Sequence, residues 1–140
     1  MTARLRATCL CGAVTLEASG APLWCANCHC SMCRRAHGAP WVTWVSFAAD
    51  AVRVVGGAEL LRERASSPEA RRTFCGACGT PMTFRSTRWA GEVHVARACF
   101  PDDAPFAPKV HAFFSDRAPW HPVGEDGLPR RGGPSGTEPI

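Results

Sequence analysis

The sequence lacks three kinds of segment that would each assign it to a large class of proteins. It has no apolar stretch near the ~18 residues of a membrane-spanning helix, so we expect no membrane as a partner. Residues 1–9 contain no apolar signal core, so we expect a cytoplasmic protein. The net charge is +4, but basic residues never form a run of about five, which argues against nucleic acid as a partner.

Cysteine, in contrast, is abundant. The nine cysteines are Cys9, Cys11, Cys25, Cys28, Cys30, Cys33, Cys75, Cys78 and Cys99. A disulfide framework needs an oxidising compartment, for which the sequence carries no signal, and an odd count leaves one thiol over. A redox Cys-x-x-Cys pair would be expected beside a βαβ pattern, which is missing. Eight of the nine are clustered, so we interpret them as metal ligands.

The apolar residues mostly alternate with a period of two, in runs broken by glycine and proline, which predicts strands. The predicted strands are residues 13–18, 41–47, 52–55, 60–64, 72–74, 82–85, 93–98 and 110–114. Only Ser31–His37 and residues 68–72 are compatible with a helical turn. The pattern therefore predicts one mainly β domain of many short strands. Residues 131–140 have no apolar periodicity, which predicts a disordered tail.

Two cysteine pairs that are distant in sequence have the spacing of two halves of one zinc site. Cys9 and Cys11 precede Gly12, and the pair Cys75 and Cys78 is likewise followed by glycine. Zinc takes four tetrahedral ligands, so thiolates from two distant loops can satisfy it. Residues two apart on a strand point to opposite faces, so Cys9 and Cys11 can chelate one ion only where the backbone turns, as Gly12 permits. We expect a structural four-cysteine zinc site.

A second group, Cys28, Cys30 and Cys33, places three thiols within six residues. Three ligands from one tight loop leave a fourth position on zinc open, and this vacancy distinguishes catalytic from structural zinc. Such a zinc can lower the pKa of a bound thiol and polarise a carbonyl. Arg34 and Arg35 follow directly and are suited to a ligand that carries a carboxylate.

Two cysteines leave alternatives open. Cys25 lies three residues before Cys28, so it can act as a fourth ligand and close the second site. Cys99 stands alone near the end of a predicted strand, and we interpret it as a core residue rather than a ligand. If Cys25 and Cys99 are spare thiols, a redox sensor that stores zinc is a further interpretation.

The ordered cysteine motifs resemble those of the glutathione-dependent formaldehyde-activating (GFA) family, which also includes the centromere-protein-V proteins. The motifs are Cys-x-Cys-Gly, Cys-His-Cys-Ser-x-Cys-Arg-Arg-x-x-Gly-Ala-Pro and Phe-Cys-x-x-Cys-Gly-Thr. The resemblance extends to the aromatic run at 41–47, to His111, to Trp120 and to residues 126–129. It implies a GFA-type zinc-binding domain over residues 5–130, made of several small coiled antiparallel sheets (a β-tent) held by cysteine-ligated zinc.

The resemblance also implies a function. Two zinc ions per chain are expected, one on Cys9, Cys11, Cys75 and Cys78 and one on Cys28, Cys30 and Cys33. The implied activity is that of a carbon–sulfur lyase, which adds glutathione or a similar thiol to formaldehyde or a related aldehyde and catalyses the reverse. Arg34 or Arg35 would pair with a glutathione carboxylate, and His29 and His37 are candidate proton carriers. The alternative is a non-catalytic, zinc-stabilised binding module like the centromeric relatives.

Overall fold

The computed structural model describes residues 4–140, which divide into two compact units. The first unit comprises the described residues up to Leu23 together with Val45–Phe106. The second comprises Trp24–Trp44 together with Ala107–Ile140. Each cysteine cluster lies wholly within one unit: Cys9, Cys11, Cys75 and Cys78 in the first, and Cys28, Cys30 and Cys33 in the second.

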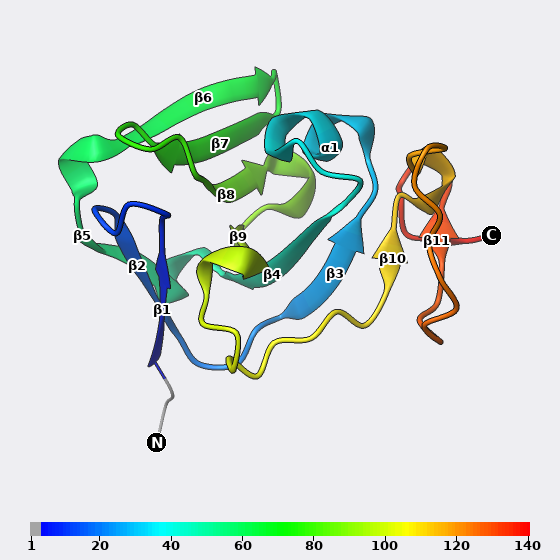
Figure 1. Ribbon diagram of the computed structural model, residues 1–140, viewed down its shortest axis with the longest axis horizontal. Coiled ribbons are helices and arrows are strands. Elements are labelled where there is room, and N and C mark those ends of the chain that lie inside the picture. Colours follow the sequence, from blue (N-terminus) through cyan, green and yellow to red (C-terminus); the bar gives the residue numbers. More distant parts are fainter. Residues whose placement is uncertain (1–3) are drawn as a thin grey trace. The chain divides into compact units, whose positions relative to one another are not determined.

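The first unit contains two antiparallel arrangements of strands. A three-stranded sheet has the order β1 (Arg4–Thr8), β2 (Thr15–Ser19) and β5 (Val52–Gly56). A meander follows the chain through β6 (Leu61–Ser67), β7 (Ala70–Cys75), β8 (Pro81–Ser86) and β9 (Glu92–Ala96). The green arrows of β6, β7 and β8 run side by side in Figure 1. The turn after β1 and the end of β7 carry the cysteines of this unit, so the ends of strands position the first cluster.

An aromatic cluster and buried aliphatic side chains form the core of the first unit. The ring of Phe47 lies 6.1 Å from that of Phe100 and 5.7 Å from that of Phe106, in tilted and edge-on contacts. Met82 and Val95 on the meander are buried as well. Phe47 belongs to β4 (Val42–Ala48), the strand predicted from the aromatic run, in which residues 44–47 are all buried.

The second unit contains the only α-helix of the described residues, α1 (Ser31–His37), which confirms the helical turn predicted there. The helix follows β3 (Trp24–Cys28), which pairs in parallel with the short strand β10 (His111–Ala112). Gly38 ends the helix with a left-handed backbone (φ 60°), a conformation that glycine adopts without steric cost. The helix therefore begins at the second cysteine cluster, because Cys30 is its N-cap.

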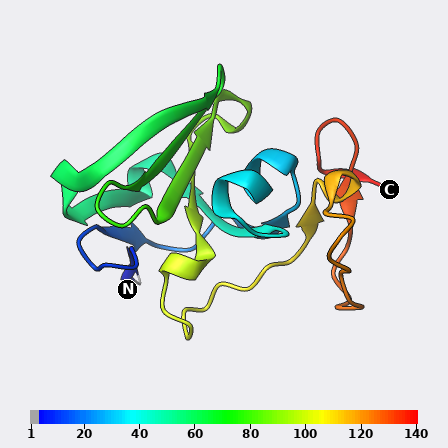
Figure 2. The same cartoon turned by 45° about the horizontal axis from the view of Figure 1, so that its top comes forward.

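Residues 131–140 differ from the expected disordered tail. β11 (Arg131–Gly132) and β12 (Glu138–Pro139) form a short antiparallel ladder. The N–H of Phe113 donates to the carbonyl of Gly136 at 2.8 Å, and the backbone of Gly136 packs directly against the Phe113 ring. Backbone hydrogen bonds and glycine turns thus order a segment that has no apolar period. Figure 2 shows β11 beside β10, where His111 also bridges to Arg130.

The mainly β architecture predicted from the sequence is confirmed, with two kinds of error. Residues 68–72 do not form a helical turn, because they make the turn between β6 and β7 and the start of β7. Strands β1 and β3 were not predicted, since both are short and their apolar residues do not alternate over a long run.

Short 3₁₀ turns connect the strands: η1 (Ala49–Ala51), η2 (Ala58–Leu60), η3 (Thr87–Trp89), η4 (Arg97–Cys99) and η5 (Phe114–Asp116). Within residues 4–140, no helix has the length and apolarity needed to cross a membrane.

Candidate metal centres

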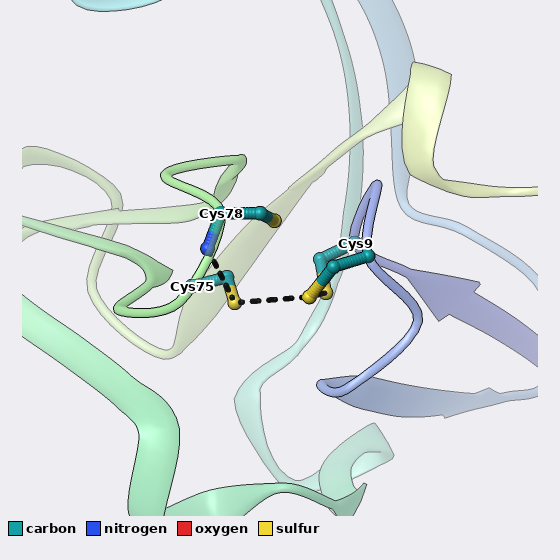
Figure 3. A group of neighbouring side chains, drawn as sticks. Cys9, Cys75 and Cys78 are labelled. Atoms are coloured by element: carbon teal, nitrogen blue, oxygen red, sulfur yellow. Dashed lines mark hydrogen bonds between the residues drawn. The ribbon is translucent and has the colours of Figure 1, made fainter.

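Four thiols of the first unit converge on one point, and they are the four predicted to form the first zinc site. The sulfur atoms of Cys9, Cys11, Cys75 and Cys78 all lie within 4.8 Å of one another. The Sγ atoms of Cys9 and Cys11 are 3.6 Å apart, and those of Cys11 and Cys75 are 3.9 Å apart. Because a disulfide is only about 2.05 Å long, these are facing thiols rather than bonded pairs. Figure 3 shows the side chains of Cys9, Cys75 and Cys78 directed toward a common centre.

The backbone around the first cluster turns its N–H groups toward sulfur. The N–H of Val14 donates to the Cys9 sulfur at 3.3 Å, and the N–H of Cys78 donates to the Cys75 sulfur at 3.4 Å. Left-handed glycines at Gly12 (φ 81°) and Gly79 (φ 82°) make both turns possible. Hydrogen bonds of this kind stabilise negative charge on sulfur, as a cysteine-ligated cation requires.

Thr80 connects the two loops of the first cluster and acidifies one of its thiols. Its hydroxyl accepts from the N–H of Leu10 at 3.0 Å and lies 3.1 Å from the Cys78 sulfur. The hydroxyl and N–H of Thr80, with the N–H of Cys11, lower the pKa of Cys78 to about 5. These hydrogen bonds favour the thiolate form of Cys78, the form that binds a cation.

The second cluster contains three thiols and lies in the second unit. The sulfur atoms of Cys28, Cys30 and Cys33 lie within 4.8 Å of one another, with 3.6 Å between Cys28 and Cys33. Cys28 ends β3, Cys30 is the N-cap of α1, and Cys33 is on the buried face of that helix. The sulfur of Cys30 accepts a hydrogen bond from the N–H of Cys33 at 3.3 Å, as the oxygen of a conventional N-cap would. Cys30 thus caps the helix and also belongs to the cluster.

Crowding of the thiols opposes the ionisation of Cys28 and Cys30. Hydrogen bonds to Cys30 and Cys33, together with burial, raise the pKa of Cys28 well above its usual range. A cation at the centre of the cluster has the opposite effect, because it stabilises the thiolates that coordinate it. The donor set therefore fits a thiophilic cation such as zinc.

The remaining two cysteines lie outside both clusters. Cys25 is buried on β3, but its sulfur is not part of the group formed by Cys28, Cys30 and Cys33. Residues three apart on a strand face opposite sides of the sheet, which accounts for this separation. The sulfur of Cys99 lies 3.6 Å from the carbonyl of Pro81, and burial raises its pKa to about 11. The interpretation of Cys99 as a non-ligand agrees with this placement.

The two arginines that follow the second cluster occupy different environments. Arg34 is half-buried, and its guanidinium donates to the carbonyls of His29 at 3.3 Å and Asp116 at 3.0 Å. Arg35 is exposed and makes no hydrogen bond or ion pair with any residue in the described part of the chain. Arg34 therefore braces the loop, whereas the donors of Arg35 are available to an external carboxylate.

The candidate proton carriers also differ in their surroundings. His37 packs edge-on against Trp44, with ring centroids 5.0 Å apart. His29 is completely buried, and its Nε2 lies 2.8 Å from Nδ1 of His111. Burial and the charge of nearby His111 lower the pKa of His29 to about 4, with smaller contributions from arginines. His29 is therefore a neutral imidazole at physiological pH.

The sequence did not identify the partners of His29 as site residues. His111 lies on β10 and Asp126 on the loop that follows, 82 and 97 positions after His29 in the chain. In the sequence, both residues only contributed to the family resemblance of the C-terminal part. That resemblance gave no indication that they contact the loop of the second cysteine cluster. Their convergence depends on the parallel pairing of β3 with β10, which links distant segments.

A mainly β protein with one four-thiol and one three-thiol cluster belongs to the class of cysteine-rich, candidate metal-binding proteins. Residues 4–116 match the family model of the glutathione-dependent formaldehyde-activating enzyme, and the chain belongs to this family. A crystal structure of a Rhodobacter sphaeroides protein is similar, with 29% sequence identity and a TM-score of 0.61, over 72% of this chain and 92% of that one. No curated protein matches the chain significantly.

Proposed function

We propose that this protein is a zinc-dependent carbon–sulfur lyase of the GFA type. It would join glutathione, or a similar low-molecular-weight thiol, to formaldehyde or a related aldehyde, and it would catalyse the reverse. The observation that carries this proposal is the number of thiols in the second cluster. Within the described residues that cluster has three sulfur donors, one fewer than the first. A three-donor site leaves a coordination position for a substrate, whereas a four-donor site does not.

The residues of each cluster suit a different role for zinc. Cys9, Cys11, Cys75 and Cys78 would hold a structural ion that joins the β1–β2 turn to the β7–β8 turn. Cys28, Cys30 and Cys33 would hold the ion at which the reaction takes place. When bound there, zinc supplies a Lewis acid that favours the thiolate form of an incoming thiol and polarises a carbonyl.

The residues around the second cluster would bind and orient the thiol substrate. Arg34 keeps the loop in place through its hydrogen bonds to the carbonyls of His29 and Asp116. Arg35 is exposed, so we assign it the glutathione carboxylate, to which a guanidinium can donate two parallel hydrogen bonds. The reaction forms one carbon–sulfur bond from a thiol and an aldehyde, and the thiol proton ends on the new hydroxyl group.

Cobalt substitution tests whether the second site accepts a thiol. Cobalt–thiolate charge-transfer bands respond to a change of ligand, so adding glutathione to the cobalt-loaded protein is expected to change the spectrum. The Cys30→Ser variant should lose this response, because it removes one of three ligands. Cys25→Ala should respond as the parent does, since Cys25 lies outside the cluster.

One pattern of results would contradict the proposal. If the parent spectrum ignored glutathione while Cys25→Ala responded to it, Cys25 would be the fourth ligand. The second site would then be closed in solution, and the chain would be a zinc-stabilised binding module rather than a lyase.

A further inference from the structure

A carboxylate and two buried imidazoles form a continuous chain of hydrogen bonds that ends at the second cysteine cluster. Oδ2 of Asp126 lies 2.6 Å from Nε2 of His111, and Nδ1 of His111 lies 2.8 Å from Nε2 of His29. His29 and His111 are 0% and 1% exposed. The rings of Trp41 and Phe114 pack against His29, with centroids 5.3 and 5.1 Å away. Such an apolar setting strengthens the hydrogen bonds between the imidazoles.

The acceptors at the carboxylate end set the direction of this chain. Oδ1 of Asp126 accepts the N–H of Leu128 at 3.0 Å, and Oδ2 accepts the Nε2–H of His111. We assign the His111 ring a single proton, on Nε2, so that its Nδ1 is an acceptor and receives the Nε2–H of His29. This leaves Nδ1 of His29 without a proton, and that buried atom has no hydrogen-bond partner among the described residues. The network thus assigns one tautomer to each ring.

This series of hydrogen bonds ends at the backbone segment that carries the ligands Cys28 and Cys30. His29 stands between Cys28 and Cys30, yet its ring nitrogens are not part of the thiol group. Its N–H donates to the carbonyl of Ala112 at 3.0 Å, and its carbonyl accepts from Arg34 at 3.3 Å. Residue 29 is therefore fixed at its N–H, its carbonyl and its ring, while the neighbouring thiols remain free to converge.

We infer that Asp126 and His111 are positioning residues for the second cysteine cluster, acting through His29. Asp126 fixes His111, His111 fixes the tautomer and orientation of His29, and His29 holds the Cys28–Cys30 backbone so that the three sulfurs converge. This inference rests on the proposed function, because the metal ion that Cys28, Cys30 and Cys33 would hold is part of that proposal. Asp126 also lies beyond residues 4–116, the segment that the family model matches.

The nearly isosteric variant Asp126→Asn is the direct test, because it reverses the hydrogen-bond chain. If the asparagine oxygen keeps the N–H of Leu128, its NH₂ group faces His111 and turns Nε2 of that ring into an acceptor. The proton of His29 would then move to Nδ1. Nitrogen-15 NMR of the imidazoles is expected to show His29 protonated at Nε2 in the full-length parent and at Nδ1 in the variant.

Metal retention provides the second readout. Mutation of a residue that supports the ligands of a metal site typically weakens metal affinity by about 10- to 100-fold. In competition with a chelator, Asp126→Asn is expected to lose cobalt from the second cluster by that factor, with the first cluster unchanged as an internal reference. The matched control is Glu92→Gln, because Glu92 makes a 3.0 Å bond to the buried His94 in the first unit and neither residue belongs to a cysteine cluster. It should change neither readout.

Several outcomes would overturn the inference. His29 protonated at Nδ1 in the parent would do so by itself, even if Asp126→Asn failed to fold. So would unchanged cobalt retention in Asp126→Asn, or an equal loss from both clusters, which would indicate only general destabilisation. The NMR measurement needs no turnover, so the inference is decided even if the parent shows no lyase activity and the proposed function fails.

Discussion

Cys78→Ser is expected to leave the protein unfolded or aggregated. Cys75 ends β7 and Cys78 lies in the turn that follows, whereas Cys9 and Cys11 lie in the β1–β2 turn, so the first cluster joins two sheets of the first unit. Structural zinc contributes about 10–16 kcal/mol in small cysteine sites, whereas a typical domain is stable by only about 5–15 kcal/mol. Loss of this ion therefore removes a contribution as large as the whole stability. Circular dichroism and a thermal melt would measure the loss.

Cys99→Ser is the matched control for this experiment. It replaces the same atom in a half-buried cysteine of the same unit that lies outside both clusters. It is expected to fold and to melt within a few degrees of the parent, the range of a change of ~1 kcal/mol. If Cys78→Ser melted like Cys99→Ser, the first cluster would have no structural role.

Cys30→Ser, in contrast, is expected to fold normally and to lose activity. Cys30 is the N-cap of α1, and serine is among the preferred N-cap residues, so the helix should keep its cap. The variant removes one of three ligands, which should abolish metal binding at the second cluster. Its rate of hemithioacetal formation from glutathione and formaldehyde is expected to fall to the uncatalysed rate. NMR of the reaction mixture would follow both directions.

Cys25→Ser controls for the loss of a buried thiol in the same unit. Cys25 is 5% exposed on β3, but it is not part of the cluster. This variant should keep the catalysed rate. Retained activity in Cys30→Ser, or its loss in Cys25→Ser, would place the reaction at another site.

The sequence predicted the local parts of the site because those parts depend on spacing. Cys28, Cys30 and Cys33 lie within six residues, so any turn of the chain at that point brings them together. The helix at Ser31–His37 followed from the same segment. Pairing the 9–11 and 75–78 motifs required an argument beyond spacing, namely that each offers only two of the four ligands that zinc takes.

The parts that the sequence did not predict depend on long-range pairing. The contact between His29 and His111 requires β3 to lie parallel to β10, and a strand of two residues gives no periodic signal. The ladder of β11 and β12 depends on backbone hydrogen bonds and glycine turns rather than on apolar side chains. The distinct environments of Arg34 and Arg35 arise because Arg34 reaches the carbonyl of Asp116, which is 82 positions away.

The central claim is that the chain holds two metal ions at sites of different kinds. Its most direct test is the zinc content of the folded protein, purified without chelator and measured by elemental analysis. The parent is expected to contain about two zinc ions per chain and the folded Cys30→Ser variant about one. A ratio of about one or less in the folded parent would contradict the two-site account.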